Sequence, residues 1–179
     1  MINQNISQKI KKDEQFINEY TTNKQGLTDK RVKPKIEKLE YTQKVLENSK
    51  NFLIMEYIEG EKIIDWAKKP ETKSDKIRLV LNNVLRECYL LDSIGLDHGE
   101  LSTIDKHVII GKNKNTIIDF ESSSTDRKPS NVTGATQAIF IGTGLAKIIQ
   151  KKIRLPTRTK IINLIRQYKK NPTLENFEK

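Results

Sequence analysis

Residues 95–124 decide the fold, and they read GLDHGELSTIDKHVII (95–110), GKNKN (111–115) and TIIDFESSS (116–124). Two short apolar runs, 108–110 and 116–118, flank a turn of glycine, asparagine and lysine, a pattern typical of a β-hairpin. Glu100 and Asp105 lie in the polar loop that enters this hairpin, and Asp119 leaves it. A hairpin holds its two ends together, so the three carboxylates are expected to converge, and a bound cation usually relieves such a cluster.

The same stretch resembles the catalytic core of the protein kinase superfamily. His98–Leu101 (HGEL) is similar to the His-Arg-Asp-Leu loop, in the His-Gly-Asp form of RIO-type and other small atypical kinases. Asp119–Glu121 (DFE) is similar to the metal-binding Asp-Phe-Gly. With Lys106-His107 and Asn131–Thr133, these motifs most resemble archaeal predicted serine/threonine kinases related to the RIO kinases, over about residues 35–148.

The resemblance implies a metal site and a catalytic loop. Asp105 and Asp119 would hold Mg²⁺, with His107 as the alternative to Asp105 if the loop is longer by two residues. Glu100 stands where kinases have the aspartate that accepts the proton of the substrate hydroxyl. Lys106 would assist the transferred phosphate.

Two further assignments follow from the same resemblance. His98 belongs to the catalytic motif, and a hydrogen-bonded structural histidine is the alternative reading of it. Glu56 and Ile58 lie in a segment similar to the hinge whose backbone binds the adenine of ATP. The implied cofactors are therefore ATP and Mg²⁺, and the implied partner is a protein substrate.

Periodicity predicts the remaining elements. The expected helices are 5–20, 62–68, 74–94 (with Ser74 as N-cap and Gly95 at its end), 131–152 and 157–170; the expected strands are 34–41, 43–46 and 51–58, with Met55 and Tyr57 in the core. The fold class is α+β: a kinase-like fold with a reduced small lobe (1–58) and a mostly helical large lobe (59–179).

The small lobe departs from the kinase pattern. Upstream of the hinge the only glycine is Gly26, so a Gly-rich phosphate loop is missing, and no Val-Ala-Ile-Lys strand precedes the first predicted helix. Glu14 in that helix then lacks the lysine that would pair with it. The leading interpretation is a serine/threonine protein kinase-like enzyme. A pseudokinase that binds partners or nucleotide without efficient turnover is the alternative, unless an upstream segment or a partner chain supplies the missing parts.

Charge and cysteine usage bound the partners. The net charge is +10, and residues 143–179 hold 10 Lys/Arg against 2 Asp/Glu, which favours anionic partners and leaves an RNA-associated basic module as a third reading. Cys88 is the single cysteine, and no run is long and apolar enough to span a bilayer. We therefore expect a cytoplasmic protein that does not bind membranes.

Overall fold

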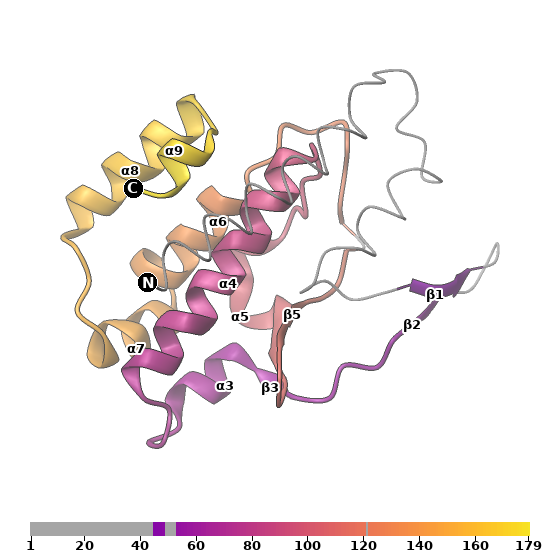
Figure 1. Cartoon of the computed structure of the whole chain (residues 1–179), viewed down its shortest axis with the longest axis horizontal. Coiled ribbons are helices and arrows are strands. Elements are labelled where there is room, and N and C mark those ends of the chain that lie inside the picture. Colours follow the sequence, from indigo (N-terminus) through magenta and orange to yellow (C-terminus); the bar gives the residue numbers. More distant parts are fainter. Residues whose placement is uncertain (1–44, 49–52, 121) are drawn as a thin grey trace.

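The computed structural model describes residues 45–48, 53–120 and 122–179, which form an α+β fold that is mostly helical (Figure 1). The elements are β1 Val45–Asn48, β2 Leu53–Met55, β3 Glu61–Lys62, α3 Ile63–Lys68, α4 Ser74–Ser93, the 3₁₀ turn η1 Leu101–Thr103, α5 Ile104–His107, β4 Val108–Ile110, β5 Asn115–Ile117, α6 Asn131–Gln137, the π-helical turn η2 Ala138–Gly142, α7 Gly144–Lys152, α8 Arg158–Lys170 and α9 Leu174–Phe177.

Helix α4 is the central element of the described core. Its apolar side chains recur at helical spacing, and those at Ile77, Val84 and Leu91 are fully buried. Cys88 is buried on the same face, as predicted. Gly95 follows the helix with φ 74°, a conformation that costs glycine little and that ends the helix.

The start of α4 differs from the prediction. Ser74 is the first helical residue, so Lys73 occupies the N-cap position and provides no side-chain hydrogen bond. Asp75 in the first turn instead places a negative charge near the positive end of the helix dipole.

The predicted hairpin is confirmed, with its second strand one residue earlier than expected. Strands β4 and β5 pair antiparallel with Val108 opposite Ile117, and Gly111 N–H donates to the carbonyl of Lys114 across the turn (2.9 Å). The short β3 adds to the other edge of β4, which gives a three-stranded sheet of order β3-β4-β5. All three residues of β5 are buried, so the second strand of the hairpin is anchored in the core.

The segment before this sheet is less regular than predicted. Within the expected strand 51–58, the described strand is β2 alone, which pairs with β1. Tyr57 is 90% exposed, so its predicted place in the core is wrong. The reason is that the chain past Met55 leaves its partner strand and crosses to the second sheet as a single extended link (Figure 1).

Other predictions for the N-terminal part are only partly covered. The expected strand 43–46 overlaps β1, whereas the expected helix 5–20 and strand 34–41 lie outside the described residues. The boundary between lobes at residue 58 falls in the link between β2 and β3 and stays a prediction.

The predicted continuous helix 131–152 is wrong, because the chain bends by 69° between η2 and α7. Gly142 and Gly144 flank the bend, and glycine disfavours a helical interior. Thr143 stabilises the break: its hydroxyl donates to the carbonyl of Ala138 and accepts from the N–H of Ala146, which caps α7.

Helices α8 and α9 close the core on the side opposite the sheet. Helix α8 matches its prediction within one residue, and the short α9 brings Phe177 onto Tyr89 of α4, with ring centroids 4.8 Å apart.

Within the described residues, no single helix is long and apolar enough to cross a membrane. The bent pair 131–142 and 144–152, taken together, has the length and composition of a membrane span, but this rests on length and composition alone.

Candidate functional site

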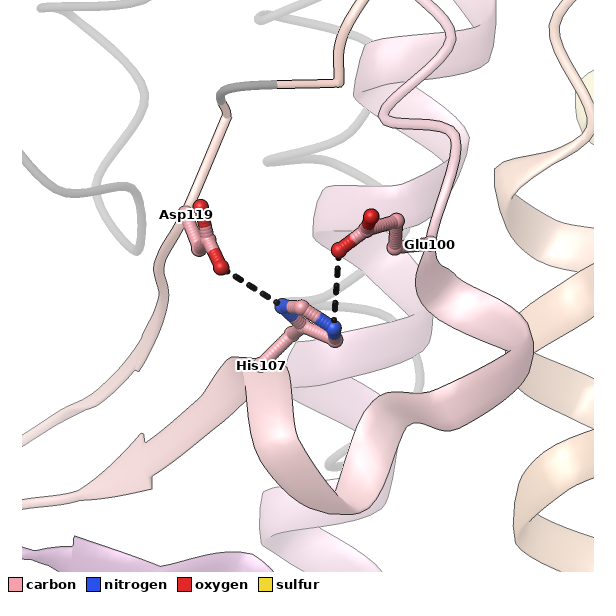
Figure 2. A group of neighbouring side chains, drawn as sticks. All are labelled: Glu100, His107 and Asp119. Atoms are coloured by element: carbon pink, nitrogen blue, oxygen red, sulfur yellow. Dashed lines mark ion pairs between the residues drawn. The ribbon is translucent and has the colours of Figure 1, made fainter.

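Three groups that can ligate a metal converge where the hairpin meets its entering loop (Figure 2). His107 lies between the two acids: its Nε2 is 3.3 Å from Glu100 Oε2, and its Nδ1 is 3.6 Å from Asp119 Oδ2. One ligand atom from each of the three residues lies within 4.8 Å of the others. The arrangement therefore puts an imidazole and two carboxylates around one small volume.

His107 is placed by the single turn of α5, which ends directly before β4. Its side chain is 6% exposed, whereas the side chains of Glu100 and Asp119 are 42% and 47% exposed. The buried Nδ1 atom has no hydrogen-bond partner and faces Asp119. Buried polar atoms are nearly always paired, so this orphaned nitrogen marks a position where a ligand would complete the site.

Asp119 is held in an unusual backbone conformation two residues after the end of β5. Its φ is 70°, the one positive value outside glycine among the described residues. Aspartate and asparagine tolerate this region better than other residues, and strained residues cluster at functional sites. The preceding residue, Ile118, is fixed on both sides: its N–H donates to the carbonyl of His107, and its carbonyl accepts from His98 Nε2, both at 3.0 Å.

His98 is fully buried behind the three-residue cluster rather than open to a substrate. Because a carbonyl oxygen can only accept, the bond to Ile118 requires the proton on Nε2. Burial lowers the pKa of His98, while the hydrogen bond to the carbonyl of Ile118 opposes the shift, so the net effect favours the neutral ring. This geometry matches the structural histidine that the sequence left as the alternative, and it makes His98 a positioning residue.

Glu100 is aimed at the cluster by the tight turn before it. Gly99 has φ 89°, and a Cβ there would lie 2.7 Å from the guanidinium of Arg127 and 2.8 Å from the carbonyl of Ser122. Only glycine fits this position. The hydroxyl of Ser122 in turn donates to Glu100 Oε1 at 2.9 Å, so each carboxylate oxygen faces a polar neighbour.

A buried network supports the loop from below. Asn131, the first residue of α6, accepts from the N–H of His98 (2.8 Å) and donates to the carbonyl of Leu96 (2.7 Å) and to Asp92 (2.8 Å). Asp92 also accepts from the hydroxyl of Tyr168 on α8. Burial raises the pKa of Asp92, while these hydrogen bonds oppose the shift. The network ties α4, α6 and α8 to the loop that carries Glu100.

The other predicted site residues lie elsewhere. Asp105 is half-buried in α5 and does not belong to the three-residue cluster; His107, two residues further on, faces Asp119 in its place. Lys106 is exposed beside the cluster. Glu56 and Ile58 are half-buried in the link between the sheets, where Glu56 pairs with Lys114 at 3.7 Å.

Sequence reasoning missed the importance of Asn131 and treated His107 as an alternative. One signal favoured His107: it directly precedes the first hairpin strand, where a side chain is well placed to reach the exit of the second strand. The role of Asn131 had no comparable signal, because its partners are 33 and more residues away.

Comparison with known proteins yields a relative without an assigned activity. The chain is 32% identical over 103 residues to the uncharacterized protein MJ1211 of Methanocaldococcus jannaschii, a match that covers 56% of this chain and 84% of the relative. No protein-family model matches the sequence.

Proposed function

Because this chain belongs to the family of the uncharacterized archaeal protein MJ1211, whose name carries no activity, we propose its function from the site itself: transfer of a phosphoryl group from ATP to a serine or threonine hydroxyl of a protein, dependent on a divalent metal. The observation that carries the proposal is the convergence of Glu100, His107 and Asp119. The motif resemblance to kinases supports it, since Glu100 precedes the hairpin, His107 opens it and Asp119 leaves it.

His107 and Asp119 are the residues that would hold the metal. Their ligand atoms, Nδ1 and Oδ2, lie 3.6 Å apart, near enough for one ion to contact both. Imidazole with carboxylate suits Mn²⁺ better than Mg²⁺, which prefers oxygen ligands. The ion would neutralise charge on the phosphates of ATP.

Glu100 would orient the hydroxyl that attacks. If Nδ1 of His107 held the metal, the ring proton would lie on Nε2, which is 3.3 Å from Glu100 Oε2, and this carboxylate would orient the imidazole as the outer partners of metal-bound histidines commonly do. The other oxygen is held by Ser122. Glu100 would then take the hydroxyl proton while the new O–P bond forms and the bond between the γ-phosphorus and the ADP oxygen breaks.

A metal titration tests the site directly. We expect Asp119→Asn and His107→Gln each to weaken Mn²⁺ binding by about tenfold or more, measured by calorimetry. Asparagine is chosen at 119 because it tolerates the positive φ. Asp105→Asn is the matched control: it removes a neighbouring carboxylate that is not in the cluster, and it should leave the affinity unchanged. Equal affinities for Asp119→Asn and the wild type would exclude this site.

Turnover is tested separately, with radiolabelled ATP, Mn²⁺ and a mixed protein substrate. We expect slow transfer by the wild type, a loss of transfer in Asp119→Asn, and a reduction in Glu100→Gln with metal affinity retained. Transfer that survives in Asp119→Asn would come from a contaminating kinase and would argue against the proposal.

A second candidate, binding of metal or nucleotide without turnover, is favoured by one observation. Both oxygens of Glu100 already face neighbours, His107 on one side and Ser122 on the other, which leaves less capacity for a substrate hydroxyl. Normal Mn²⁺ affinity with no transfer by the folded wild type would select this candidate.

A further inference from the structure

A groove lies between α8 and the α6–η2 segment, and Ser102 from the loop that carries Glu100 also lines it. Its volume is about 520 Å³, within the range of ligand-binding clefts. The π-helical turn η2 forms part of its wall, and such turns are frequent at functional sites. Helices α6 and α8 contact each other beside it.

One face of α8 forms the basic wall of this groove. Arg158, Ile162, Ile165, Arg166 and Lys169 all line it, and their spacing of four, three, one and three residues is that of a single helical face. Ile165 is buried and Ile162 half-buried, whereas the three cations are exposed. The face therefore offers an aliphatic floor with positive charges along it.

Among the described residues of the opposite wall, none is an acid that would neutralise these cations. It is built from Ser102, Thr133, Gln137 and Thr143 together with small and aliphatic residues. Within the described part of the chain, no ion pair includes Arg158, Arg166 or Lys169. Three positive charges around one cleft, with no acidic partner among the described residues, attract an anionic partner.

We propose that this groove binds an acidic peptide segment of a partner protein, with glutamate or aspartate side chains on the three cations and an aliphatic side chain on the isoleucines. A peptide fits better than RNA for two reasons. None of the described residues that line the groove is aromatic, so they offer bases nothing to stack on. The aliphatic floor is matched by a leucine or isoleucine side chain but not by a nucleotide backbone.

One residue that lines the groove is also close in sequence to the three-residue cluster. Ser102 lines it and follows Glu100 by two residues, so a bound segment would run close to the catalytic loop. The binding itself does not depend on phosphoryl transfer and holds equally for a protein that binds without turnover.

Fluorescence anisotropy with a short labelled peptide, in which glutamates flank a leucine, tests the proposal without ATP or metal. The double variant Arg166→Glu/Lys169→Glu should weaken binding by about tenfold or more, because two attractions become repulsions. The matched control is Lys160→Glu/Lys170→Glu, which changes the net charge equally, on exposed residues of the same helix that do not line the groove. This control should bind within about twofold of the wild type.

Three results would overturn the proposal. Equal weakening in both double variants would show general attraction between polyelectrolytes. If replacing the leucine of the peptide by glycine left the affinity unchanged, the isoleucines of the groove would not contribute to binding. Single-stranded RNA that binds more tightly than the peptide, with the same dependence on Arg166 and Lys169, would make the groove a nucleic-acid surface. Circular dichroism confirms that each variant is folded.

Discussion

Replacement of Asn131 by alanine tests whether the buried network under the loop that carries Glu100 holds the fold together. Asn131 is 2% exposed and makes three side-chain hydrogen bonds, to the N–H of His98, the carbonyl of Leu96 and the carboxylate of Asp92. In Asn131→Ala, the two main-chain groups lose this partner inside the protein. Each buried polar group left unpaired costs about 1–3 kcal/mol.

We therefore expect Asn131→Ala to lower the free energy of unfolding by about 3 kcal/mol, since Asp92 keeps its bonds to Tyr168 and to the main chain of α6. Urea denaturation followed by circular dichroism measures this change. Asn163→Ala on the exposed face of α8 is the matched control and should change the free energy by less than about 0.5 kcal/mol. A loss below about 1 kcal/mol in Asn131→Ala would refute the reasoning, because water or a small shift would then satisfy the freed groups.

Two further predictions concern pH and close packing. The pKa of His98 is lowered in the folded protein from 6.5, so its contribution to stability is complete above pH 6.5 and is lost as the pH falls through the folded-state pKa. The difference in unfolding free energy between wild type and His98→Gln should therefore be constant above pH 7 and shrink in acid, and a difference independent of pH would contradict the assignment. Gly60→Ala should destabilise the protein by about 1–3 kcal/mol, because its Cβ would lie 2.5 Å from the carbonyl oxygen of Ile110. Gly142→Ala, where no atom lies within 4 Å, is the control in the same thermal-unfolding assay, and equal melting temperatures for the two variants would exclude the contact.

The sequence by itself determined the elements whose signals are local. The spacing of Ile77, Val84 and Leu91 predicts α4, and Gly95 predicts its end. Both signals are local, because the apolar repeat of a helix lies within one continuous segment of sequence. The hairpin 108–117 was predicted for the same reason, since its turn and both strands lie in one short segment.

The candidate site was only partly predictable from sequence. Glu100 and Asp119 were named because the two ends of a hairpin meet whatever the rest of the fold does. The identity of the third residue in the cluster depended on α5. This turn lies directly before β4 and presents His107, not Asp105, to Asp119. Side-chain direction in such a short turn follows from packing against the core, not from spacing along the chain.

Only the tertiary structure decided the burial of His98, the bend at Thr143 and the groove along α8. His98 is buried where Ile118, which follows β5, accepts a hydrogen bond from its ring and Asn131 of α6 accepts one from its main-chain N–H. The helix predicted through Thr143 breaks because α6 packs on α4 whereas α7 packs on α3, and the Thr143 hydroxyl caps the start of α7. Each of these features arises from contacts between segments distant in sequence, and the free energy of such contacts outweighs the local preferences that a sequence pattern records.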